Sequence, residues 1–129
     1  MKIYGIGTDI VKTDRFDFWL DKPDLVSRFF SAEEIPSDEC TRQEKKEKLA
    51  VRFAAKEAFS KALGTGLKGF CLAEIYITKD NEGKPDIALK GRSLKRAEDI
   101  LGKKYCLHVS LSHEKEYATA FVVAEIPEE

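Results

Sequence analysis

The sequence predicts an α+β fold in which a mainly antiparallel sheet packs around one long central helix, within a single domain that covers residues 1–129. Three patterns support this prediction. Residues 2–11 alternate with the two-residue period of a β-strand, and residues 105–126 contain two further such stretches joined by a short polar turn. Residues 42–63 contain neither proline nor glycine, which is typical of one uninterrupted helix.

The first element is expected to be a core strand with two different faces. One face carries Tyr4, Ile6, Thr8 and Ile10, and the other carries Ile3, Gly5, Gly7, Asp9 and Val11. In residues 13–39, Pro23 and Pro36 break the pattern, so short helices are expected there, one of them opened by a capping box of Ser31 and Glu34.

The long helix is expected to begin after Thr41, which can form a cap with Glu44, and to end at Gly64. The remaining elements follow from period and turn residues. In chain order they are a strand over 72–78, a turn over 79–85, a short edge strand over 87–89, a helix over 93–101, and a hairpin of strands over 105–112 and 118–126.

Composition argues against several classes of protein. With 22 basic and 23 acidic residues the net charge is -1, so the whole molecule has no electrostatic preference for nucleic acid or anionic membranes. The N-terminus has no signal-peptide pattern, and no apolar run approaches the roughly 18 residues of a membrane span. The three cysteines show no disulfide or zinc-ligand spacing and are interpreted as reduced thiols. We therefore expect a cytoplasmic protein without nucleic-acid or membrane partners.

Two acidic residues are candidates for binding a cation. Asp9 lies within a strand, where aspartate is rare, and we expect Gly5 and Gly7 to leave a hollow beside its carboxylate. Glu57 shares one face of the long helix with Lys61, among alanines that should leave room for a ligand. Two carboxylates suit Mg²⁺. An aspartate bonded to the backbone and a plain helical ion pair remain as simpler alternatives.

Two further features could contact an anion. Gly64, Thr65 and Gly66 could wrap backbone N–H groups around a phosphate, although a plain helix cap would use the same residues. His113 ends a predicted strand, where its side chain can reach a pocket. With a cation bound nearby, Lys61 and His113 would face the phosphates.

Three segments, GIGTDIV at residues 5–11, RFAAKEAFSKALGTG at residues 52–66 and VSLSH at residues 109–113, occur with a distinctive order and spacing. In this respect the chain resembles the holo-acyl-carrier-protein synthases, a family of phosphopantetheinyl transferases whose members are small and trimeric. Residues 30–34, 81–85 and 116–118 are also similar to this family. The resemblance extends from the N-terminus to about Glu125.

The resemblance implies that the phosphopantetheine arm of coenzyme A is transferred to a serine of apo-acyl carrier protein. The products are holo-acyl carrier protein and adenosine 3',5'-bisphosphate, and the reaction supports fatty acid biosynthesis. It further implies that Asp9 and Glu57 bind Mg²⁺ and that both are catalytic together with Lys61 and His113. The coenzyme is then expected at Lys61, Gly64, Thr65, Gly66, Lys84, Pro85 and His113.

The resemblance also implies a homotrimer whose active sites lie at subunit interfaces. Carrier protein would dock on Arg15 and Arg28, in a region that also contains Asp14, Asp17, Asp21 and Asp24. The general base is left open between Glu57, Glu114 and a metal-bound water.

Two other classes of function remain open from the sequence. A non-catalytic module that binds coenzyme A or a nucleotide would need neither carboxylate. A structural assembly protein could use buried ion pairs to fix its oligomer register.

Overall fold

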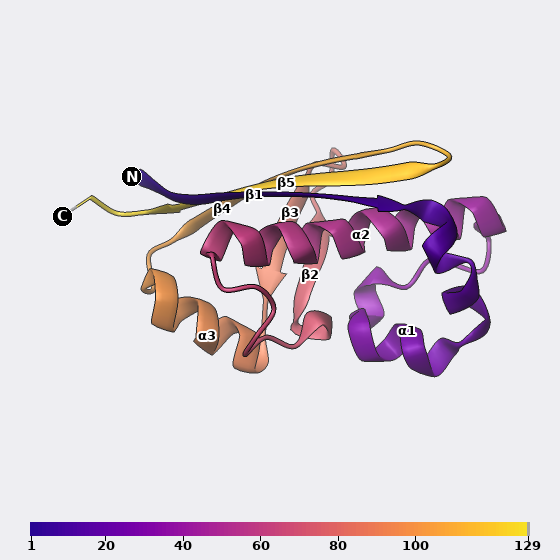
Figure 1. Cartoon of the computed structure of the whole chain (residues 1–129), viewed down its shortest axis with the longest axis horizontal. Coiled ribbons are helices and arrows are strands. Elements are labelled where there is room, and N and C mark those ends of the chain that lie inside the picture. The colour runs from indigo at the N-terminus through magenta and orange to yellow at the C-terminus, as the bar shows by residue number, and fades with distance from the viewer. Residues whose placement is uncertain (129) are drawn as a thin grey trace.

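A three-stranded antiparallel sheet with one helix packed on it forms the centre of the molecule. The computed structural model describes residues 1–128. The strands lie in the order β1 (Lys2–Lys12), β5 (Tyr117–Ile126) and β4 (Cys106–His113). Helix α2 (Arg42–Leu63) runs along β1 and β5 on one face of this sheet (Figure 1). The predicted fold class is therefore confirmed.

Shorter elements cover the two ends of α2. Helix α1 (Pro23–Phe29) lies near the N-terminal half of α2, and α3 (Gly91–Leu101) lies near its C-terminal end (Figure 1). Strands β2 (Ile75–Lys79) and β3 (Pro85–Leu89) form a separate antiparallel pair. Short 3₁₀ turns complete the chain: η1 (Thr13–Phe16), η2 (Phe18–Asp21), η3 (Ala32–Glu34) and η4 (Leu72–Glu74).

Local chemistry fixes both ends of α2 where the sequence predicts them. The Thr41 hydroxyl accepts the Glu44 N–H at 3.1 Å, and Glu44 Oε1 accepts the Thr41 N–H at 2.9 Å. Gly64 ends the helix with a φ of 78°, which favours glycine. Strand β2 begins at Ile75, later than predicted, because the residues before it form the turn η4.

Gly5 and Gly7 bring β1 into direct contact with the backbone of α2. A Cβ atom at Gly5 would lie 1.9 Å from the Ala62 carbonyl oxygen, and one at Gly7 would lie 1.9 Å from that of Ala58. The prediction of a hollow beside Asp9 is therefore wrong, because the backbone of the helix fills that space. The alanines of α2 are likewise buried in this contact and leave no room there for a ligand.

The apolar side of β1 faces away from the core. Ile6 and Ile10 are 53% and 62% exposed, and Phe121 on the neighbouring strand is 46% exposed. Strand β1 is also an edge strand of its sheet. The predicted strand is present, but the prediction that it lies in the core is wrong. Alternation of apolar residues does not specify which face of the strand packs against the helix.

A buried ion pair that the sequence analysis missed joins three elements. Lys56 Nζ on α2 lies 2.6 Å from Glu34 Oε1 on η3, and both side chains are fully buried. Lys56 also donates to the carbonyls of Leu72 and Ile75, and Glu34 accepts the Ile77 N–H. Burial lowers the pKa of Lys56, while the charge of Glu34 opposes this effect. The pair therefore fixes η3 and β2 to the helix.

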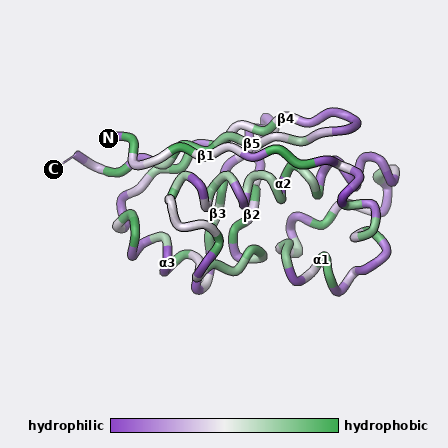
Figure 2. Tube along the Cα trace, in the orientation of Figure 1, coloured by the Kyte–Doolittle hydropathy of each residue, from purple (hydrophilic) through white to green (hydrophobic). Residues whose placement is uncertain are grey.

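Hydrophobic residues gather along α2 and the adjoining strands, while the outer loops are hydrophilic (Figure 2). Within residues 1–128, no helix combines the length and the hydropathy that a membrane crossing would require.

Candidate active site

Strand β1 and helix α2 bring Asp9 and Lys61 together. Lys61 Nζ lies 3.1 Å from Asp9 Oδ1 and donates to the Thr8 carbonyl oxygen at 3.0 Å. The Asp9 side chain is 17% exposed and that of Lys61 is 52% exposed, so the pair lies at the protein surface. Lys61 is thus held across two elements by Asp9. The alternative of a plain ion pair between Glu57 and Lys61 does not describe this site.

Glu57 shares the site with these two residues. Burial raises the pKa of the Glu57 carboxyl, the negative charge of Asp9 raises it further, and Lys61 and Arg15 act in the opposite direction. Glu57 lies one helical turn before Lys61 on α2, so the two side chains leave the same flank of the helix. Two carboxylates with no sulfur or nitrogen ligand form a donor set that suits Mg²⁺.

Arg15 lies on the side of this site formed by η1. Its guanidinium is stacked over the Phe53 ring at 4.7 Å from the centroid, and its charge acts on Glu57. Arg28, the other predicted docking residue, lies on α1 with its guanidinium over the Phe29 ring at 5.7 Å. The structure therefore places one predicted docking residue beside the carboxylates and the other on the neighbouring helix.

Other predicted residues line a pocket on the opposite flank of α2. This cavity of about 190 Å³ includes His113 and Pro85 together with three basic side chains, Lys48, Arg52 and Lys79. His113 Nδ1 lies 2.8 Å from Glu47 Oε1, and the His113 side chain is 44% exposed. The pocket is thus positively charged and open to solvent, as an anion site requires.

Arg52 is a functional candidate to which the sequence analysis assigned no role. Its Nε atom is buried without a hydrogen-bond partner, one of two such side-chain atoms in residues 1–128. Burial lowers the pKa of the Arg52 guanidinium, although Glu34 and Cys40 oppose this effect. Because Arg52 also lines the basic pocket, its guanidinium could donate to an anion such as a phosphate there. The sequence did contain a pattern that could have indicated Arg52: it lies four residues after Lys48, which puts two basic side chains on one flank of the helix.

The predicted glycine loop forms a helix cap. The N–H groups of Gly64 and Thr65 both donate to the Ser60 carbonyl, as in the simpler alternative, so these two amides do not point into an anion cradle. Lys84 lines a separate hollow together with Pro85 and Asp86, between the β2–β3 pair and β4. Contact of this loop and of Lys84 with a nucleotide stays a prediction.

The carboxylate site and the basic pocket lie on opposite sides of one chain. Glu57 and Arg52 are five residues apart on α2, which places them about 140° apart around the helix axis. Asp9 lies on β1 and His113 on β4, with β5 between them, so about 10 Å separates their strands. Helix α2 also packs against the sheet between the two groups. The residues predicted to act together therefore do not converge within one copy.

The site thus combines carboxylates, whose oxygens suit a divalent cation, with a separate basic pocket that suits an anion. Comparison with known families is more specific. The family model described as the 4'-phosphopantetheinyl transferase superfamily matches residues 5–122. The chain belongs to this family.

Individual relatives agree with this assignment. A protein named holo-[acyl-carrier-protein] synthase from Treponema denticola is 44% identical over 123 residues, which cover 95% of this chain and 98% of the relative. Among solved structures, the holo-(acyl-carrier-protein) synthase of Bacillus anthracis in complex with CoA (3',5'-ADP) is 33% identical with a TM-score of 0.80, covering 98% of this chain and 100% of that one. The holo-[acyl-carrier-protein] synthase of Helicobacter pylori in complex with coenzyme A is 32% identical with a TM-score of 0.74, covering 93% and 99%.

Proposed function

We propose that this chain transfers the phosphopantetheine arm of coenzyme A to a serine hydroxyl of apo-acyl carrier protein. The products are holo-acyl carrier protein and adenosine 3',5'-bisphosphate. The observation that carries the proposal is the contact between Asp9 on β1 and Lys61 on α2, with Glu57 one helical turn before Lys61 on the same helix flank. Similarity over nearly the whole chain to proteins named holo-[acyl-carrier-protein] synthase supports the same reaction.

Asp9 and Glu57 would hold Mg²⁺ through their carboxylate oxygens. When bound, the ion would supply positive charge to the phosphate oxygens around the reacting phosphorus. Lys61 adds a second positive charge at the same place, and its bonds to Asp9 and to the Thr8 carbonyl fix the direction of its side chain. Lys61, together with an ion held by the two carboxylates, would thus supply the positive charge that an attack on a diphosphate requires.

The reaction forms one oxygen–phosphorus bond and breaks another. The carrier serine oxygen attacks the phosphorus that bears the pantetheine arm, and the bond to the nucleotide phosphate breaks. The serine proton passes to a base. Glu114 is a poor candidate for this base, because its Oε1 atom accepts the N–H groups of Glu116 and Tyr117 in the β4–β5 turn. Glu57 or a metal-bound water then remains.

The basic pocket would hold the nucleotide end of coenzyme A. Lys48, Arg52 and His113 line it, and the Arg52 guanidinium would donate to a phosphate bound there. A cavity of about 190 Å³ accommodates only part of a molecule as long as coenzyme A. The diphosphate would therefore extend out of the pocket toward the carboxylates.

A second copy of the chain would complete the site. The carboxylates and the pocket lie on opposite flanks of α2, so a coenzyme A molecule that contacts both would lie between neighbouring copies. The exposed apolar face around Ile6, Ile10 and Phe121 offers a surface for this association. Repeating one head-to-tail contact around an axis closes a ring, and we propose a homotrimer with three such sites.

The acidic carrier would dock beside Arg15 and Arg28. Three of the four acidic residues of this region pair with two bases near the start of α2. Lys46 lies 2.6 Å from Asp14, and Arg42 lies 2.8 Å from Asp17 and 3.1 Å from Asp21. Arg15 and Arg28 take part in none of these pairs and would offer their charges to an acidic partner.

Intact-mass spectrometry of an apo-carrier, incubated with the protein, coenzyme A and Mg²⁺, tests the proposal. We expect the carrier to gain one phosphopantetheine arm, and Asp9→Asn to abolish this gain while the protein stays folded. Asp99→Asn on the exposed face of α3 is the matched control and should leave transfer unchanged. Binding of coenzyme A without any mass gain would instead support the non-catalytic module. A cytoplasmic location and a role in fatty acid biosynthesis stay predictions.

A further inference from the structure

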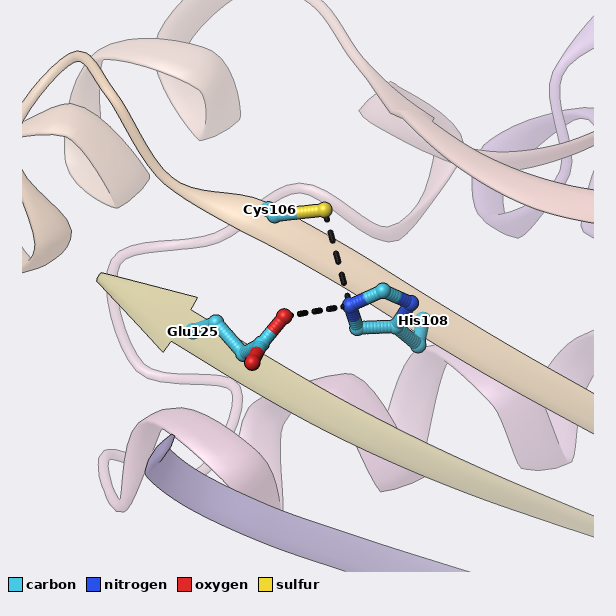
Figure 3. Close-up of side chains that lie close together, drawn as sticks. All are labelled: Cys106, His108 and Glu125. Carbon is cyan, nitrogen blue, oxygen red and sulfur yellow. Dashed lines mark hydrogen bonds and ion pairs between the residues drawn. The ribbon is translucent and has the colours of Figure 1, made fainter. Parts of the chain in front are cut away.

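Cys106, His108 and Glu125 form a cluster that the proposed reaction does not use. His108 Nε2 lies 3.5 Å from Cys106 Sγ and 2.6 Å from Glu125 Oε1. One ligand atom from each residue lies within 4.8 Å of the other two. Figure 3 shows the three side chains pointing toward one another from β4 and β5. Both neighbours thus converge on the same ring nitrogen.

Two paired strands hold this cluster. Cys106 and His108 are two residues apart on β4, so their side chains leave the same face of the strand. Glu125 is the direct partner of Cys106 in the β4–β5 ladder, and its side chain therefore lies on that face too. Ligands on paired strands are placed more accurately than ligands on loops.

We propose that these three residues bind a divalent transition-metal ion of the Zn²⁺ class. Thiolate, imidazole and carboxylate are the three protein ligand types that zinc takes. A sulfur and a nitrogen bound to tetrahedral zinc lie about 3.5 Å apart, as Cys106 Sγ and His108 Nε2 already do. The Glu125 oxygen now shares a proton with His108. For a metal ion to replace this hydrogen bond, the Glu125 oxygen must move away from His108 Nε2 by less than about 1 Å.

Within a single copy of the chain, the site is accessible and leaves one metal position open. His108 is 55% exposed and Glu125 is 28% exposed. Cys106 and His108 also line a cavity of about 560 Å³ between the β2–β3 pair and β4, which gives an ion a route from solvent. Three protein ligands leave a fourth tetrahedral position for water.

This site is separate from the proposed magnesium site. Asp9 pairs with Ala120 on β5, five residues before Glu125, which is about 17 Å along the strand. The ligand types also differ, because sulfur and imidazole select zinc-like ions whereas two carboxylates suit Mg²⁺. The sequence analysis found no zinc-ligand spacing because a Cys-x-His pair brings its two ligands together only when it lies on a strand.

Titration of the EDTA-treated full-length protein with Co²⁺ tests the site, because a cobalt–thiolate bond absorbs in the near ultraviolet. We expect one Co²⁺ per chain, displaced by Zn²⁺ but not by excess Mg²⁺. Cys106→Ser should abolish the absorption band, and Cys106→Ser and His108→Asn should each weaken Zn²⁺ binding by at least about 10-fold. Cys40→Ser, Cys71→Ser and Asp9→Asn are matched controls that should bind as the unchanged protein does.

A thiolate band that survives in Cys106→Ser, or the absence of any band in the unchanged protein, would overturn the proposal. A second measurement does not depend on variants folding. Zn²⁺ should slow the alkylation of Cys106 by iodoacetamide, read by peptide mass spectrometry, without slowing that of Cys40 or Cys71. An alkylation rate of Cys106 that is the same with and without Zn²⁺ would also overturn the proposal.

Discussion

Gly7→Ala tests the contact that places Asp9 against α2. The new Cβ atom would lie 1.9 Å from the Ala58 carbonyl oxygen, whereas real Cβ atoms keep at least 3.0 Å, so strand and helix must separate by about 1.1 Å. The obstacle is helix backbone and cannot rotate aside. Overpacking of this kind costs about 1–3 kcal/mol or more of unfolding free energy. Because Asp9 follows two residues later, a displacement of about 1 Å at the site should lower transfer about 100-fold.

The assay combines urea unfolding with the initial rate of carrier modification, measured by intact mass. Gly102→Ala is the matched control, because a Cβ atom there meets nothing within 4 Å and the substitution strains only a φ of +82°. It should cost about 1–3 kcal/mol of stability and leave the rate of transfer by folded protein unchanged. A Gly7→Ala protein with the stability and rate of the unchanged chain would refute the reasoning.

Three further predictions follow from individual contacts. In the metal-free protein, the pKa of the Glu57 carboxyl is raised above its ordinary value of 4.5, so the native state binds the carboxyl proton more tightly than the unfolded chain does. The free energy of unfolding therefore falls as the pH rises through the raised pKa. Glu57→Gln should therefore raise the metal-free melting temperature at pH 7 and abolish its increase with Mg²⁺; a lower metal-free melting temperature would contradict this. Lys56→Met leaves the Glu34 charge buried without its partner and should cost about 3–5 kcal/mol in urea unfolding, with partial recovery in Lys56→Met combined with Glu34→Gln; a loss below about 1 kcal/mol would show that the pair is unimportant. Ile10→Glu on the open sheet face should reduce the oligomer mass measured by light scattering, whereas Ile35→Glu, an exposed apolar residue outside the sheet, should not; an unchanged mass for Ile10→Glu would exclude this face as the interface.

Local signals made the element order predictable from the sequence. The Thr41 capping box, the Gly64 stop and the strand alternations each depend on residues a few positions apart, and the structure contains all of them. Asp9 and Lys61 were both site candidates in the sequence, through the family resemblance and the rarity of aspartate within a strand, and the structure brings these two together; joint metal binding by Asp9 and Glu57 stays a prediction.

The remaining features depend on residues distant in sequence. Which face of β1 meets α2 is decided by a backbone contact with Ala58 and Ala62, and no pattern within β1 specifies it. The partner of Lys56 lies 22 residues away on a short turn. Glu57 and Arg52 belong to one motif, yet helix geometry points them to opposite flanks. This separation is what implies a site shared between copies.

Co-expression of two inactive variants tests the shared site most directly. Asp9→Asn removes the carboxylate half, and Arg52→Gln combined with His113→Ala removes the pocket half. If neighbouring copies build each site together, random mixing at equal amounts restores about a quarter of the interfaces, and with them about a quarter of the transfer activity. If one copy contains the whole site, the mixed protein will show no more activity than the two variants measured separately.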